Sequence, residues 1–153
     1  MKRACLYALC GLVVIGAAGA QDRPMGTGSY TGTINIDGSI IEMADTARKG
    51  QAALEAYARN KAFLLFGSLS KPLLADSDTY EAVVEFTEGR WIGTSRIELF
   101  RVFLEVRGDD FAELSKITVG ARAIAVVDRP VIKAGPDGQP AVFVRLLSIR
   151  LIR

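Results

Sequence analysis

The sequence predicts a mainly β, α+β domain in which an antiparallel barrel follows one strand and one helix. Three observations indicate this fold class. Residues 61–152 form runs of strand length, rich in branched and aromatic side chains, that are separated by turn residues. Residues 42–60 carry the clearest helical pattern. Within residues 91–107 the apolar positions change parity, which is typical of a strongly bent barrel strand.

The first twenty residues have the pattern of a secretory signal peptide. Two basic residues precede an apolar run, residues 4–15, that is shorter than the roughly 20 residues of a membrane-spanning helix. Residues 18–20 are Ala-Gly-Ala, which places small side chains at the two positions that signal peptidase reads. We expect cleavage after Ala20 and an exported protein, periplasmic or otherwise extracytoplasmic. The alternative is a protein anchored in the membrane by an uncleaved signal.

Cleavage would change the charge and the cysteine content of the chain. The full chain has 19 basic and 17 acidic residues, and two of the bases, Lys2 and Arg3, lie in the signal segment. The mature protein therefore has 17 of each sign. Because a balanced charge gives no long-range attraction to polyanions, we expect no nucleic-acid partner, and no membrane contact after cleavage. Both cysteines, Cys5 and Cys10, are also removed, so the mature protein can form no disulfide.

The absence of histidine and of mature cysteine restricts the possible chemistry. It excludes His-based triads, cysteine nucleophiles and the usual zinc and haem ligand sets. The glycines at 26, 28 and 32 lack the Gly-Lys-Ser/Thr ending of a phosphate-binding loop. No catalytic residue, metal ligand or cofactor is therefore expected.

The N-terminal elements are expected in a simple order. Residues 21–28 form a flexible lead-in and residues 29–36 a short strand. Residues 42–60 form one helix, because they are rich in strong helix formers, although Gly50 weakens it by about 1 kcal/mol relative to alanine. An apolar stripe at helical spacing should face the barrel: Met43, Ala47, Leu54, Tyr57 and Ala58.

Five strands and a short helix are expected to follow. The strands cover residues 62–69, 80–87, 91–107, 117–127 and 141–152, with breaks at 72–78, 88–90 and 135–138. In the third strand, the change of parity predicts a β-bulge near Leu99-Phe100. A helix over residues 109–116 separates the third and fourth strands, because Asp109 or Asp110 can cap it.

This order of elements over residues 61–152 resembles the OB-fold, a five-stranded Greek-key barrel with a helix between its third and fourth strands. The strand and helix before residue 61 are additions to that pattern. The alternative is a cystatin-like arrangement, in which one helix crosses a curved antiparallel sheet. In either case residues 29–153 are expected to form one mature domain.

The resemblance implies a ligand face on the second and third barrel strands. There Glu85 lies near Arg101 and Phe103, and pairing between glutamate and arginine explains these charges without a ligand. The candidate binding residues are Arg90, Trp91, Arg96, Arg101 and Phe103. An exposed Trp91 between two guanidinium groups would form a recognition surface. The favoured expectation is that Trp91 is buried under the helix, since tryptophan is usually well buried.

Two classes of function are open to such a protein. The first is an exported, non-catalytic binding or interaction protein that recognises an unknown protein, peptide or small molecule. The alternative is a carboxylate-based hydrolase of the cell envelope. For that chemistry the clustered acids are Asp76, Asp78, Glu81 and Glu85.

Overall fold

A computed structural model describes residues 32–76, 81–107, 114 and 116–152 of the chain. The expected signal peptide and lead-in lie outside these residues, as does most of the expected helix over residues 109–116. Within the described part, no helix combines the length and the apolar character needed to cross a membrane.

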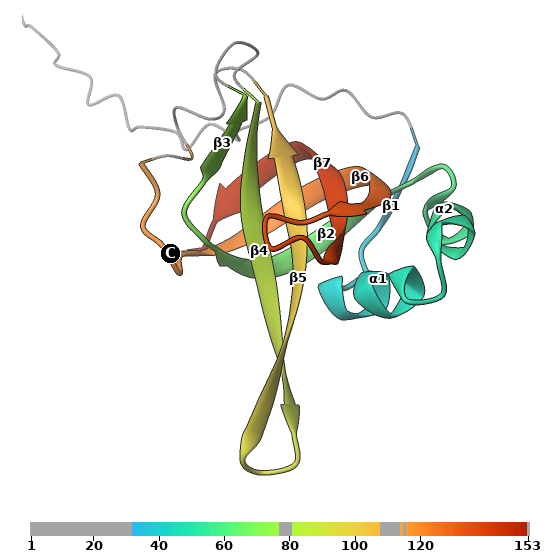
Figure 1. Cartoon of the computed structure of the whole chain (residues 1–153), viewed down its shortest axis with the longest axis horizontal. Coiled ribbons are helices and arrows are strands. Elements are labelled where there is room, and N and C mark those ends of the chain that lie inside the picture. The colour runs from blue at the N-terminus through green and yellow to red at the C-terminus, as the bar shows by residue number, and fades with distance from the viewer. Residues whose placement is uncertain (1–31, 77–80, 108–113, 115, 153) are drawn as a thin grey trace, which may run out of the picture.

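Five strands close into a barrel (Figure 1). They are β2 (Lys61–Leu69), β4 (Glu81–Ile92), β5 (Arg96–Val106), β6 (Arg122–Ala134) and β7 (Pro140–Leu151). The antiparallel pairs are β2–β4, β4–β5, β6–β7 and β2–β6, and β5 pairs with β7 in parallel. This closed order confirms the OB-like fold. The cystatin-like alternative is wrong, because β2 joins both β4 and β6 and leaves no open sheet.

The other elements are added around this barrel. β1 (Thr33–Asn35) pairs in parallel with the start of β2. β3 (Leu73–Asp76) pairs with the start of β4, so the segment 72–78, which was expected to be a break, contains a strand. The fourth barrel strand, β6, begins and ends later than the expected strand over residues 117–127.

The expected single helix is two helices, α1 (Ile40–Ala47) and α2 (Gln51–Ala58). The division is at Gly50, whose φ is +104°, a conformation that residues with a side chain rarely adopt. The amide of Gly50 bonds the carbonyl of Ala47 at 2.9 Å and closes α1, while Gly50 itself is the N-cap of α2. The prediction of one helix was therefore wrong, because glycine here changes the direction of the chain.

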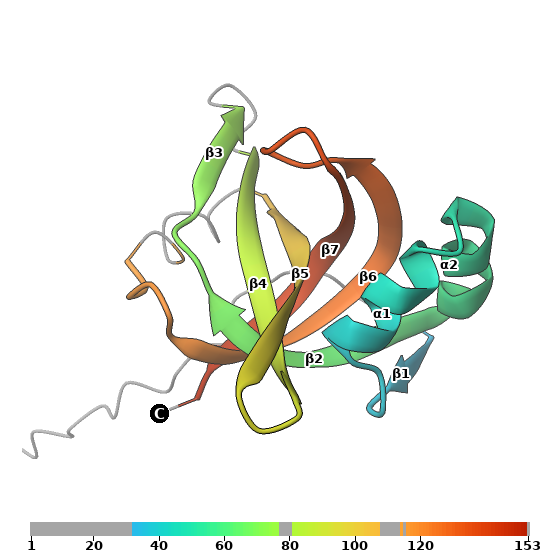
Figure 2. The same cartoon turned by 60° about the horizontal axis from the view of Figure 1, so that its bottom comes forward.

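The apolar stripe of the two helices packs against the barrel, as expected. Met43 and Leu54 are buried in the core, and Ile40 joins them. The N-cap residue Ser39 begins α1, because its hydroxyl accepts from the amide of Glu42 at 3.1 Å. Glu88 of β4 accepts from the amide of Ile40, also at 3.1 Å, which places α1 beside the base of the β4–β5 hairpin (Figure 2).

The distal half of the β4–β5 hairpin projects from the barrel as a two-stranded arm (Figure 1). Its register is unbroken from Ala82 opposite Val106 to Ile92 opposite Arg96. The expected break at residues 88–90 is therefore inside β4, and the turn is at residues 93–95. The expected β-bulge near Leu99-Phe100 is also absent from this register.

The parity change within β5 has a different cause. Phe100, Val102 and Leu104 face the core and are buried, whereas Ile97 and Leu99 lie on the opposite face, where they are exposed. The strand leaves the barrel at this point, so its apolar side chains change face without any slip of the backbone.

Candidate binding surface on the hairpin arm

The outer face of the arm carries an apolar surface that we call the hairpin patch, formed by Trp91, Ile97 and Leu99. Trp91 is the cross-strand partner of Ile97, and Gly89 is the partner of Leu99. Alternate residues of a strand point to the same side, so the three large side chains share one face. Trp91 is 65% exposed, Ile97 50% and Leu99 72%.

The absence of a side chain at Gly89 leaves room for the patch residues of β5 on this face of the hairpin. A Cβ atom at Gly89 would lie 3.2 Å from Cγ2 of Ile97 and 3.6 Å from Cδ2 of Leu99. The space that a side chain would occupy is thus already used by these two residues. Glycine at this position lets the apolar side chains of β5 reach across to β4.

The opposite face of the arm is charged. The Nη2 atom of Arg90 lies 2.9 Å from Oε2 of Glu98, and its guanidinium lies 4.8 Å from the centre of the Phe100 ring. Arg48, the C-cap residue of α1, also approaches Glu98, at 3.9 Å. Arg96 forms no ion pair with any residue that the structure describes.

Two expectations about Trp91 are corrected by this geometry. Trp91 was expected to be buried, but β4 carries it beyond the rim of the barrel, and α1 packs at the hairpin's base instead. Trp91 is also not placed between two guanidinium groups. Arg90 and Arg96 are on the other face of the ribbon, because neighbouring residues of a strand point in opposite directions.

The remaining candidate residues, Arg101 and Phe103, lie nearer the barrel. Phe103 is only 3% exposed and stacks on Phe143 of β7, with ring centres 5.0 Å apart. The guanidinium of Arg101 lies 5.6 Å from the centre of the Phe103 ring. Lys133 lies 5.4 Å from the Phe143 ring centre. The stacked pair is therefore covered by its own cations, and Phe103 is not available for direct contact.

Both of these cations are held by carboxylates. Arg101 lies 3.5 Å from Glu85 and donates to Asp137 in the β6–β7 turn. The hydrogen bond between Arg101 and Asp137 raises the pKa of the guanidinium and lowers that of the Asp137 carboxyl below its usual 3.8. Lys133 pairs in the same way with Glu105. The expected pairing of glutamate with arginine on this face is confirmed by Glu85 and Arg101.

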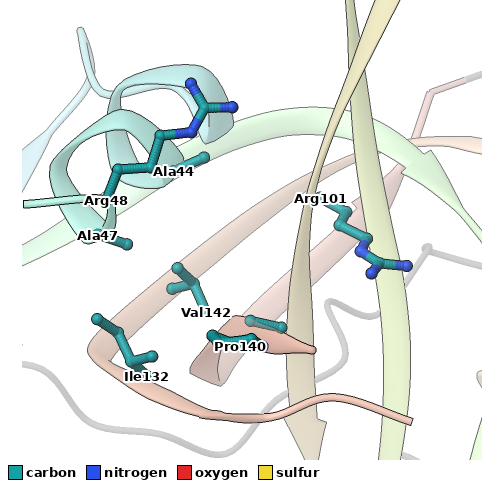
Figure 3. Close-up of a pocket in the computed structure, with 8 residues that line it drawn as sticks. Ala44, Ala47, Arg48, Arg101, Ile132, Pro140 and Val142 are labelled. Carbon is teal, nitrogen blue, oxygen red and sulfur yellow. The ribbon is translucent and has the colours of Figure 1, made fainter. Parts of the chain in front are cut away.

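A hollow of about 200 Å³ lies between α1, β5 and the β6–β7 hairpin (Figure 3). Its walls are mainly apolar, with Ala44, Ala47, Ile132 and Val142 among them. The guanidinium groups of two arginines, Arg48 and Arg101, point away from the hollow in Figure 3. Because no charged end group enters it, and because small-molecule sites measure roughly 300–1,000 Å³, we place the candidate site on the hairpin patch.

The acids that a hydrolase would use are not brought together among the described side chains. Glu85 is engaged with Arg101, and the side chains of Asp76, Asp78 and Glu81 lie outside the described set. Within the described ranges, no three acidic side chains gather in a way that could hold a metal ion.

Sequence reasoning missed Ile97 and Leu99 as members of the surface. The signal that could have found them is Gly93-Thr94-Ser95, three small residues suited to a tight turn. A hairpin with its turn there places Trp91 opposite Ile97 and puts Leu99 on the same face. The sequence predicts the turn at Glu88-Gly89-Arg90 instead, and this prediction places Trp91 in the wrong strand.

Comparison with known proteins gives matches only at the level of structure. No family model matches the chain, and no curated protein matches it. A putative aspartyl-tRNA synthetase from Leishmania major Friedlin is similar over 82% of this chain and 21% of its own, at 11% identity and a TM-score of 0.47. A mitochondrial single-stranded DNA-binding protein from S. cerevisiae is similar over 60% of this chain and 94% of its own, at 11% identity and a TM-score of 0.37.

These matches correct one expectation. Nucleic acid was excluded as a partner on the ground of balanced charge, yet a single-stranded DNA-binding protein is among the structures that resemble this chain. The exclusion was wrong, because proteins can bind single strands through a local groove and stacking side chains, which net charge does not describe. At 11% identity the likeness concerns the fold and assigns no ligand to this chain.

Proposed function

We propose that the protein is an exported, non-catalytic binding protein that uses the hairpin patch as its contact surface. The observation that carries this proposal is the exposure of three large apolar side chains, Trp91, Ile97 and Leu99, on one face of a projecting arm. Contiguous exposed apolar surface is uncommon on a soluble domain and marks interaction sites. Tryptophan is among the residues that contribute most to binding energy.

Export is supported by the N-terminal sequence. The basic start, the short apolar run and the small residues before Gln21 form a signal-peptide pattern. We therefore place the binding activity at the envelope, in the periplasm or at the cell surface.

A hydrolase finds less support in the same geometry. Among the candidate acids, Glu85 has a described side chain, and its Oε1 atom lies 3.5 Å from Nη1 of Arg101. This ion pair occupies the Glu85 side chain, and the other candidate acids have no described side chain that could act with it.

Co-sedimentation with the cell envelope of the organism that encodes the protein tests the proposal. The mature protein should sediment with envelope membranes, and Leu99→Asp should reduce binding at least tenfold, because it places a charge within the apolar patch. Val119→Asp is the matched control, since Val119 is similarly exposed, at 62%, but lies outside the hairpin. Equal binding by all three proteins would contradict the proposed role of the hairpin.

A further inference from the structure

We infer that the hairpin patch inserts into the surface of an anionic lipid bilayer. This inference rests on the proposed binding role of the arm and names its partner. No membrane contact after cleavage was expected, because the basic and acidic residues balance. Net charge does not describe an apolar patch formed by residues of two strands.

The first argument is the shape of the arm. It extends from the barrel and ends in the turn at residues 93–95 (Figures 1 and 2). The apolar residues lie within the four cross-strand pairs nearest this turn, from Gly89–Leu99 to Ile92–Arg96, and the charges of the Arg90–Glu98 pair among them are matched to each other. At roughly 3.4 Å per residue these pairs span about 10 Å. Interfacial segments bury their apolar faces about 5–10 Å into the boundary between headgroups and acyl chains, so the lengths agree.

The second argument is the distribution of apolar groups around the end of the arm. Trp91 and Ile97 lie on one face, while Ile92, which is 42% exposed, lies on the other. The turn itself, Gly93-Thr94-Ser95, carries no charge. A flat protein surface would cover only one of these faces. A bilayer surrounds an inserted tip on all sides, and tryptophan is enriched at its interface with water.

The third argument is charge complementarity. Glu98 is paired with Arg90 at 2.9 Å, whereas Arg96, in the last pair before the turn, has no ion-pair partner in the described part of the chain. The end of the arm therefore presents one unneutralised positive charge. The long arginine side chain can reach lipid phosphates from the headgroup region, while its aliphatic part packs with the neighbouring apolar side chains. A basic residue near an anionic surface strengthens binding about fivefold.

The free edges of the arm limit how deep it enters. Residues 88–92 pair only with β5, and residues 96–102 pair only with β4, so their outer edges have no ladder partner among the described residues. Unpaired backbone groups cannot enter the dry hydrocarbon core. They are tolerated in the hydrated headgroup region. The arm is consequently suited to shallow insertion.

Flotation of the mature protein with protein-free vesicles tests this inference. One set of vesicles contains phosphatidylcholine with phosphatidylglycerol, and the other contains phosphatidylcholine alone. Trp91 is the single tryptophan of the chain, so its emission reports directly on the patch. We expect flotation with the anionic vesicles and a blue shift of emission. Binding to phosphatidylcholine alone should be at least fivefold weaker.

Three variants separate the contributions. Leu99→Asp should reduce vesicle binding at least tenfold, and Arg96→Gln should reduce it about fivefold on anionic vesicles only. Val119→Asp should bind like the unmodified protein. Circular dichroism establishes that each variant is folded, and Ile97→Ser replaces Leu99→Asp if that variant does not fold.

Three outcomes would overturn the inference. If the protein binds envelope membranes through Leu99 but neither floats with vesicles nor changes its emission, the partner is a macromolecule of the envelope other than lipid, and the proposed function stands. If Val119→Asp weakens vesicle binding as much as Leu99→Asp, adsorption is not specific to the arm. Failure in both envelope and vesicle assays would contradict the proposed function itself.

Discussion

Trp91 lies directly across the β4–β5 ladder from Ile97, and both side chains face solvent on the arm. The fluorescence of the free protein should therefore be red, near the unfolded limit, and readily quenched by acrylamide. Trp91→Ala should change the free energy of unfolding by less than about 1 kcal/mol. Phe86→Ala, a truncation of a fully buried ring, should cost about 3–5 kcal/mol. Blue, protected emission without lipid would contradict the exposed position of Trp91.

Gly50→Ala distinguishes two helices from one. In a continuous helix, alanine would stabilise the protein by about 1 kcal/mol relative to glycine. At the observed φ of +104°, alanine is strained although no atom lies within 4 Å of its Cβ. We expect a loss of about 1–3 kcal/mol in the free energy of unfolding, measured by urea denaturation. A gain in stability would show that the helix continues through this residue.

Tyr57 should make the stability of the protein depend on alkaline pH. Its ring stacks on Phe63. Burial raises the Tyr57 pKa from 10.0 to about 12, and the negative charge of Glu42 and a hydrogen bond from the phenol to the Glu42 carboxylate at 3.2 Å add to this effect. A raised pKa in the folded state favours the protonated phenol. The contribution of the protonated Tyr57 phenol to the free energy of unfolding is complete below pH 10 and is lost as the pH rises through 12.

The size of this effect is on the order of 1 kcal/mol, because the half-buried group is partly screened by solvent. Denaturation of the mature protein and of Tyr57→Phe, compared from pH 9 to pH 12, measures it. The variant should lose less stability over this range. Since the other tyrosines are unchanged, parallel pH profiles for the two proteins would refute the assignment.

The proposed export of the protein predicts which residue is its N-terminus after processing. Mass spectrometry of protein isolated from the native organism should find Gln21 as the first residue, because signal peptidase cleaves after small residues such as those at 18–20. N-terminal glutamine can cyclise, so the mass can be lower by one ammonia. Replacing Ala20 with a bulky residue should block processing. Retention of Met1 or Lys2 in the native protein would contradict cleavage.

The barrel could be predicted from the sequence because each of its strands carries a local signal. β2 and β7 are apolar runs of strand length, and Gly135-Pro136-Asp137-Gly138 joins β6 to β7 at a turn. The apolar stripe of the helices was likewise visible in the spacing of Met43 and Leu54. These patterns depend on neighbouring residues, so they can be read without knowing the fold.

The candidate site depends on relationships between distant residues, and these were predicted poorly. Alternation identifies which residues of a strand share a face, but it does not say whether that face meets the core or solvent. The sequence predicts that Ile97 and Leu99 belong to a bulged core strand, since apolar residues are usually buried. They are exposed because β4 and β5 extend together beyond the rim of the barrel.

The sequence by itself determined the order of the five barrel strands, the helical stripe and the absence of histidine chemistry. It did so because backbone preference and side-chain periodicity are local properties. Only the tertiary structure decided the break at Gly50, the exposure of Trp91 and the cover that Arg101 forms over Phe103. Each of these depends on which surface another element covers, and burial is a property of the whole packed chain.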